Sequence, residues 1–207
     1  MLAYLLLTVC STVLCIVTIV VDKRIFKTGD VSLNAPQASH DIPTSRLGGI
    51  AILISSVGFS FYQNGFMGWE LFLIVLPLFF IGLLEDLGFN NPPSIRLLVA
   101  SLSSLIGVYI YASWLSNIDT FAIDWLLSFP ILGIIFTIFA IVGLVNAINL
   151  IDGLHGLACG QVIISAIAIS VVALKVDEQN IANLAQIIAF STIGLFLLNY
   201  PFGYLFL

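Results

Sequence analysis

The residues best suited to chemistry lie between positions 146 and 160, which read Asn-Ala-Ile-Asn-Leu-Ile-Asp-Gly-Leu-His-Gly-Leu-Ala-Cys-Gly. Asn146, Asn149 and Asp152 are three residues apart and would share one face of a helix. His155 continues that step, but the neighbouring glycines favour a break and let the backbone approach a ligand closely. Amides and a carboxylate beside glycines suit a phosphorylated or nucleotide ligand. The alternative is a capped helix end followed by polar loop residues.

A second candidate is the acidic pair Glu85 and Asp86, which ends an apolar stretch. Two carboxylates at the C-terminal end of a helix oppose the helix dipole, which favours cations there. A magnesium ion would relieve this, because Mg²⁺ binds a few carboxylates and shares the phosphate oxygens of a substrate. Arg96 follows ten residues later and is a candidate phosphate ligand. The alternative is a solvated helix end followed by a proline-rich turn.

A third candidate is the proline-punctuated segment 34–49, which contains His40 and Arg46. A guanidinium group pairs well with phosphate, so Arg46 could bind a phosphorylated substrate. Alternatively, Arg46 anchors the cytoplasmic end of a membrane helix and His40 is solvated. The solvated interpretation suits His40 better than a role at a site.

The elements that must position these residues are membrane helices. The 207 residues are 60% hydrophobic and only 8% charged, whereas soluble domains carry about 25% charged residues. Composition therefore excludes a single soluble core, and we predict an all-α integral membrane protein with one transmembrane domain over residues 1–207. About seven spans are expected, at 2–21, 47–62, 70–84, 95–115, 129–148, 160–175 and 181–198.

The basic residues predict the orientation of these spans. Lys175 lies on one side, and five basic residues contain or border the loops of the other side: Lys23, Arg24, Lys27, Arg46 and Arg96. The positive-inside rule places the larger set in the cytoplasm and the N-terminus outside. The three polar segments 34–49, 85–96 and 146–160 then face the cytoplasm, whereas outer loops such as 116–128 show no comparable grouping.

Together these segments resemble the polyprenyl-phosphate N-acetylhexosamine-1-phosphate transferases, which form glycosyltransferase family 4. The family pattern is a His…Pro-x-x-Arg-x-Gly-Gly loop, an acidic pair after the third helix, and Asn-Ala-x-Asn-x-x-Asp-Gly-x-(Asp/Asn)-Gly-Leu-Ala. The matching positions here run from His40 to Gly49, then Glu85-Asp86, then from Asn146 to Ala158. Two departures stand out: the acidic pair begins with Glu, as in one branch of the family, and His155 replaces the second Asp or Asn.

The resemblance implies transfer of a sugar 1-phosphate from a UDP-N-acetylhexosamine to undecaprenyl phosphate, with release of UMP and dependence on Mg²⁺. It places the protein in the inner (cytoplasmic) membrane with a cytoplasmic active face, in the synthesis of cell wall or lipopolysaccharide. Partners would be the UDP-sugar, the polyprenyl phosphate and the lipid bilayer, with a homodimer left open and no nucleic acid.

By the same resemblance, the candidate residues take three kinds of role. Catalysis is assigned to Asp86, Glu85 and Asp152. Metal binding is assigned to Asn149 and Asp86. Substrate binding is assigned to Asn146, Asn149, His155, Arg96, Arg46 and His40.

The resemblance also implies a Gly-Asp-x-Gly motif whose Asp binds magnesium in the family. Residues 199–207 resemble the lead-in to that motif. We therefore expect the sequence to be the N-terminal part of a longer family fold. The competing hypotheses are a catalytically incomplete membrane fragment or a helix scaffold that needs a second polypeptide. A transporter fits less well, because it would need polar residues at mid-depth, spans two to seven are nearly free of charges there, and no inverted repeat is visible.

Overall fold

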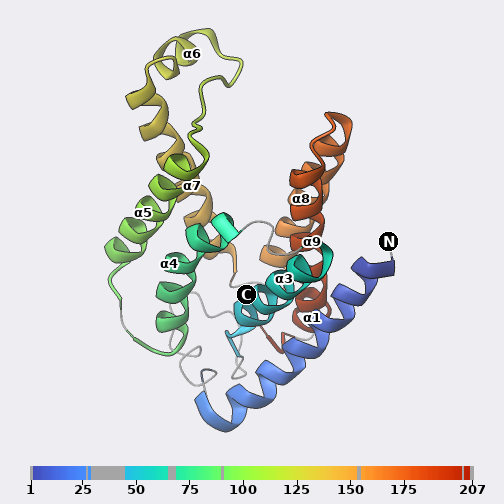
Figure 1. Cartoon of the computed structure of the whole chain (residues 1–207). Coiled ribbons are helices and arrows are strands. Elements are labelled where there is room, and N and C mark those ends of the chain that lie inside the picture. The colour runs from blue at the N-terminus through green and yellow to red at the C-terminus, as the bar shows by residue number, and fades with distance from the viewer. Residues whose placement is uncertain are drawn as a thin grey trace. The chain divides into compact units, whose positions relative to one another are not determined.

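The computed structural model describes residues 2–26, 28, 45–64, 69–89, 91–152, 155–201 and 203–205. Over these ranges the chain is helical, apart from turns and one isolated parallel bridge between Ser45 and Leu205. The predicted all-α class is therefore confirmed (Figure 1). In chain order the helices are α1 (Leu2–Val21), the π-helical η1 (Asp22–Phe26), α3 (Gly48–Asn64), α4 (Trp69–Asp86), α5 (Pro93–Tyr111), α6 (Phe121–Leu127), α7 (Pro130–Ile151), α8 (Leu157–Lys175) and α9 (Gln179–Asn199).

Each of the seven predicted spans corresponds to a helix, and five described helices are long and apolar enough to cross a membrane. These five are Leu2–Phe26, Pro93–Tyr111, Pro130–Ile151, Leu157–Lys175 and Gln179–Asn199. The other two are marginal for different reasons. Helix α3 has 17 residues, and α4 carries Glu70, Glu85 and Asp86 within its 18 residues. The structure therefore supports a polytopic membrane protein, and the full count of seven spans stays a prediction.

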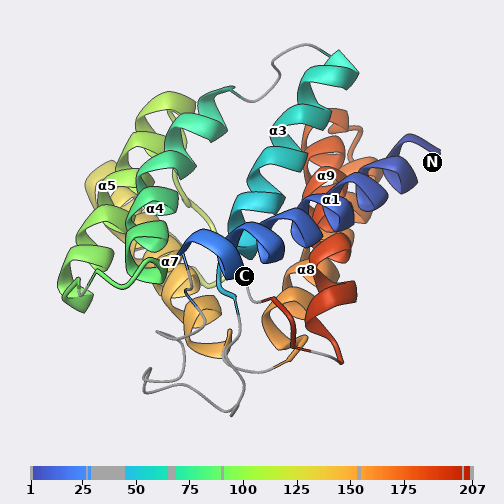
Figure 2. The same ribbon diagram turned by 90° about the horizontal axis from the view of Figure 1, so that it is seen from below.

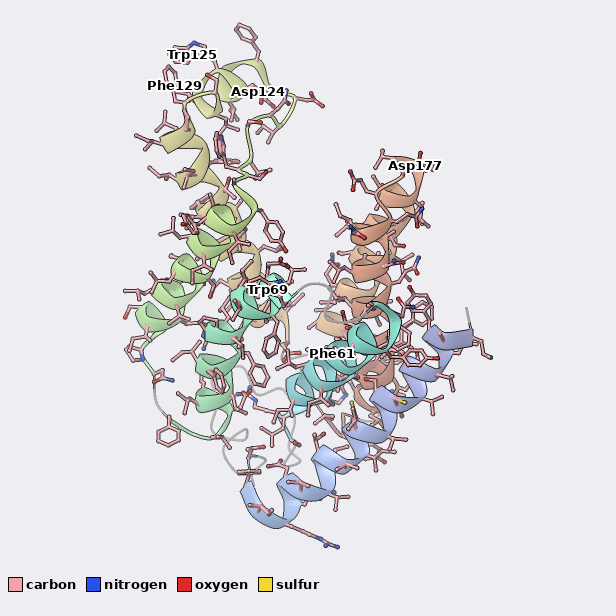
Figure 3. The ribbon with its side chains drawn as sticks, in the orientation of Figure 1. Phe61, Trp69, Asp124, Trp125, Phe129 and Asp177 are labelled. Atoms are coloured by element: carbon pink, nitrogen blue, oxygen red, sulfur yellow. The ribbon has the colours of Figure 1, made fainter. Side chains whose placement is uncertain are left out.

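Helix α6 was not expected, because it lies in the segment 116–128 that the sequence predicts as an outer loop. Asp124 on α6 links the helix to the segment that precedes it: its Oδ1 accepts a hydrogen bond from the amide of Ile118 at 2.8 Å. Trp125 packs edge to face on Phe129, with ring centroids 5.6 Å apart (Figure 3). Both rings are exposed to a large extent, so this short helix is fixed by local contacts rather than by a core.

The chain forms two compact units, one of residues 1–67, 86–88 and 150–207 and the other of residues 68–85 and 89–149. In the first unit α9 packs against α1, α3 and α8 (Figures 1 and 2). Small residues allow this close approach, as is usual between membrane helices. A Cβ atom at Gly194 would lie 2.6 Å from Cβ of Ser11. Buried alanines share this role on α9: Ala182, Ala185 and Ala189.

Hydroxyl groups form hydrogen bonds between α9 and its neighbours α1 and α3 across the lines of contact between the helices, called seams below. Ser11 donates to the carbonyl of Ser191 at 2.7 Å, and Thr8 donates to the carbonyl of Phe190 at 3.1 Å. From α3, Ser56 reaches Oγ of Ser191 at 3.0 Å. Because lipid supplies no hydrophobic force between helices, such bonds and close packing are what hold them together.

The second unit contains α4, α5, α6 and α7, which approach one another at separate points. Ile74 on α4 lies within 3.5 Å of the Cβ position of Gly107 on α5. After α5, the ring of Trp114 covers Gly133 at the start of α7. The amide of Leu115 donates to Oγ1 of Thr137 at 2.8 Å. Large apolar side chains remain exposed in this unit, as suits a lipid-facing surface: Tyr109, Phe121, Ile131 and Phe139.

Candidate functional site

The acidic pair sits in the last turn of α4, where a glycine ends the helix. Gly88 adopts φ 92°, a left-handed conformation that glycine accepts without strain. The amide of Phe89 then donates to the carbonyl of Leu84 at 3.0 Å, which is the bond of a Schellman cap. Glu85 and Asp86 are therefore fixed on the last turn, and both are partly exposed.

Glu85 forms an ion pair with Arg96, which lies in the first turns of α5. The side chains are 34% and 21% exposed respectively, so solvent screens the pair and its stabilisation is about 0–1 kcal/mol. The guanidinium supplies part of the positive charge that the helix end requires. Arg96, expected as a phosphate ligand, thus contacts a carboxylate of the acidic pair.

The third motif spans the junction between α7 and α8. Asn146 and Asn149 lie three residues apart near the end of α7, so they share a face of that helix. The helix ends at Ile151, Asp152 lies in the following turn, and α8 begins after Gly156 in a left-handed conformation with φ 77°. The break that the glycines predict is therefore confirmed.

His155 and Gly156 are held against the end of α9. The amide of Gly156 donates to Oδ1 of Asn199, a residue that is 1% exposed. The imidazole of His155 is packed so closely on Gly203 that a Cβ there would lie 2.5 Å from Nε2. Gly203 also has φ 63°, so only glycine suits this position.

The segment before α3 is tied to the same end of the first unit. Ser45 pairs with Leu205 in the parallel bridge, and the amide of Arg46 donates to Oγ1 of Thr28 at 3.4 Å. Thr28 in turn donates to Asp22 from its amide at 3.0 Å and from its hydroxyl at 2.7 Å. His40 lies outside the described residues.

Sequence reasoning missed three buried polar residues, Asp22, Thr28 and Asn199. These residues are 2%, 1% and 1% exposed, respectively. Asp22 directly follows α1 and Asn199 ends α9, so each is a polar residue at the end of a long apolar stretch. Buried polar groups are costly unless paired. A polar residue at the end of a long apolar stretch is therefore the sequence signal that could have identified Asp22 and Asn199.

The predicted site residues are divided between the two units. The first unit holds Asp86, Asp152, His155 and Arg46, and the second holds Glu85, Arg96, Asn146 and Asn149. Their division follows the chain, because the unit boundaries fall inside the acidic pair and inside the third motif.

The donor atoms fit magnesium by their chemistry. Among the described residues no group of three or more His, Cys, Asp or Glu side chains could hold a metal ion. Mg²⁺ does not require one, because it commonly binds one or two protein oxygen ligands together with water and substrate phosphates. Asp86 and Asn149, the expected ligands, both supply oxygen atoms.

Comparison with known proteins identifies the family. The model of glycosyl transferase family 4 matches residues 69–207, from the start of α4 to the last residue. The match includes the acidic pair and the whole of the third motif. No curated protein and no solved structure shows significant similarity to the chain. With more than half of its residues matched, the chain belongs to glycosyl transferase family 4.

Proposed function

We propose that the protein transfers a sugar 1-phosphate from a UDP-N-acetylhexosamine to undecaprenyl phosphate and releases UMP. The reaction would take place at the cytoplasmic face of the inner membrane, in the synthesis of cell-envelope glycans. The observation that carries the proposal is the family match across Glu85-Asp86 and the Asn-Asp motif. Both motifs lie at the ends of apolar helices, where a soluble nucleotide and a lipid headgroup can meet.

In this reaction an oxygen of the lipid phosphate forms a bond to the β-phosphorus of the UDP-sugar. The bond from that phosphorus to the bridging oxygen breaks, and UMP leaves with the electron pair. A phosphate monoester has a second pKa of about 6 and is mostly dianionic at neutral pH. The nucleophile therefore needs little help from a base, and catalysis depends on positioning and charge neutralisation.

The residues take roles that follow from their surroundings. We assign the organisation of the metal or nucleophile to the acidic pair Glu85 and Asp86, of which Glu85 is held by its ion pair with Arg96, with Asp152 as a further acidic group. Asp86 and Asn149 would hold Mg²⁺, which when bound supplies charge neutralisation at the diphosphate.

The remaining polar side chains bind the substrates in this proposal. His155 contacts the uracil and Asn146 the nucleotide sugar, while Arg46 contacts phosphate. His40 belongs to the substrate-binding set by the family resemblance alone. Arg96 contributes to the site indirectly, because its ion pair with Glu85 orients that carboxylate.

The cytoplasmic orientation has its own test. Single cysteines are introduced at Ser94 and Ser116, both exposed, in a variant of the protein whose exposed Cys10 has been replaced. In cells that express this variant, the two cysteines should react with an impermeant thiol reagent from opposite sides of the membrane. Ser94 should label only from inside and Ser116 only from outside. Labelling of both positions from one side would contradict the orientation.

The reaction is tested by UMP release from UDP-N-acetylhexosamine with undecaprenyl phosphate and Mg²⁺. The chain should be assayed alone and joined to a segment that carries Gly-Asp-x-Gly, with Asp124→Asn on α6 as a control outside the motif sequences. We expect release from the joined form at a rate within the usual enzymatic range of about 1–10³ per second. Release only after addition of a second polypeptide would support the scaffold alternative, and no release in any form would reject the proposal.

A further inference from the structure

Asn199 uses both ends of its side-chain amide inside the first unit. Its Oδ1 accepts a hydrogen bond from the amide of Gly156, and its Nδ2 donates to the carbonyl of Leu205 at 2.7 Å. The residue is 1% exposed. A buried amide that is satisfied at both ends is costly to disturb, because the loss of either bond leaves a backbone group without its partner.

The two partners belong to segments that carry candidate site residues. Gly156 directly follows His155 and precedes α8. Leu205 forms the parallel bridge with Ser45, the residue before Arg46. One side chain therefore joins the turn of the third motif to the segment that leads into α3.

The surroundings leave this junction little freedom. A Cβ atom on Gly156 would lie 3.0 Å from Cβ of Tyr200, whose ring stacks on Phe196 with centroids 5.7 Å apart. On the other side, Gly203 accommodates the ring of His155. The amide of Gly203 also donates to the backbone carbonyl of Asn199 at 2.7 Å, which ties Gly203 to the end of α9.

We infer that Asn199 is a positioning residue: it holds the His155–Gly156 turn and the Ser45–Arg46 segment in the arrangement that binds the nucleotide. The inference rests on the proposed function, because it assigns the nucleotide to this end of the first unit. The amide is the suitable group here, since it both accepts from Gly156 and donates to Leu205. A carboxylate could only accept, and an aliphatic side chain could do neither.

The test compares substitutions at Asn199 with the same substitutions at Asn183. Asn183 also lies on α9, and its Oδ1 accepts a hydrogen bond from the hydroxyl of Tyr4 at 3.4 Å. It is partly exposed and lies in the first turns of α9, whereas Asn199 ends that helix. Two readouts are used for each variant of the full chain: amide hydrogen exchange over residues 155–160 and 45–50, and the Kd for UMP in the presence of Mg²⁺.

Asn199→Leu should speed exchange about tenfold or more in both segments and raise the Kd for UMP about tenfold, which is about 1.4 kcal/mol. Asn199→Asp should act selectively. It keeps the acceptor for Gly156, and its negative charge suits the N-terminal end of α8, so residues 155–160 should stay protected while residues 45–50 exchange faster. Both Asn183 variants should leave the two readouts within about twofold of the parent, a difference of about 0.4 kcal/mol.

Equal exchange in the Asn199 and Asn183 variants would overturn the inference. So would faster exchange at residues 155–160 with an unchanged Kd for UMP, because the turn would then not position the ligand. If the parent chain fails to bind UMP, the proposed function is contradicted, and the exchange data still decide whether Asn199 holds the two segments. If Asn199→Leu does not fold, the selective pattern expected for Asn199→Asp decides.

Discussion

The two units of this protein have similar apolar helices but are held together differently. In the first unit, glycine, alanine, serine and threonine line the seams of α9, and hydroxyl groups bond directly to carbonyls of neighbouring helices. In the second unit, the described links among α4, α5, α7 and the segment after α5 are separate: an ion pair, an Ile–Gly contact, a Trp–Gly contact and a hydrogen bond from a backbone amide to Thr137. Overall hydrophobicity is therefore a poor guide to packing in a membrane, where small residues decide how closely helices approach.

The same contrast applies to the candidate site residues. In the first unit, the backbones beside His155 and Arg46 are held by the buried side chains of Asn199 and Thr28. In the second unit, Glu85 is held by a partly exposed ion pair with Arg96. We therefore expect substitutions at Asn199 and Thr28 to act through geometry, and substitutions at Glu85 to act weakly through charge.

The largest expected effect separates the two members of the acidic pair. In an active form of the enzyme, Asp86→Asn should lower kcat by about 10²-fold or more, the order observed when a group that stabilises transition-state charge is removed. Glu85→Gln should lower kcat clearly less, because that carboxylate is engaged in a partly exposed ion pair with Arg96. Steady-state UMP release measures both, and a near-parental kcat for Asp86→Asn would remove Asp86 from the mechanism.

The next effect compares one glycine from each unit. In Gly194→Ala the new methyl group would lie 2.6 Å from Cβ of Ser11, so α1 and α9 must separate, at a typical cost of about 1–3 kcal/mol for overpacking. In Gly82→Ala, on α4, the methyl group meets nothing within 4 Å and should stabilise by about 0.5–1 kcal/mol through helix propensity.

Unfolding of both variants in detergent, followed by circular dichroism, gives the comparison. Equal stability changes for Gly194→Ala and Gly82→Ala would show that the seam of the first unit is no tighter than the second unit.

His155 gives a smaller effect that distinguishes binding from chemistry. We expect His155→Ala to raise the KM for the UDP-sugar about tenfold with little change in kcat, the pattern of lost uniform binding. An unchanged KM with a lower melting temperature would mean that His155 only supports the break before α8. A collapse of kcat at constant KM would instead make it a catalytic residue.

The smallest effect concerns two buried serines with bonds of the same length. Ser11 donates across a helix seam to Ser191 at 2.7 Å, whereas Ser104 donates within α5 to the carbonyl of Ala100 at 2.7 Å. Ser11→Ala should destabilise by about 0.6 kcal/mol, the average for such bonds between membrane helices. Ser104→Ala should be close to neutral, because a bond to the preceding turn adds little to a helix. The reverse order in equilibrium unfolding would contradict the role given to the seam.

Much of the fold follows from the sequence because helix formation in a membrane is a local property. Long apolar runs must satisfy their backbone within one segment, so the runs around α1, α5, α7, α8 and α9 are recognisable directly. Gly156 predicted the break before α8 for an equally local reason. Helix α6 escaped prediction because it is short and rests on particular contacts of Asp124, Trp125 and Phe129.

The chemistry of the site could likewise be predicted as residue types: the amides and carboxylate of the third motif and the acidic pair are visible as a pattern, and the family match includes them. Which groups contact one another was decided only by the tertiary structure. The pairing of Glu85 with Arg96 joins two helices. The bridge from Gly156 through Asn199 to Leu205 joins the end of α9 to two segments that precede α8 and follow α9. Such contacts depend on how whole helices pack, and the spacing of residues along one chain carries no information about that.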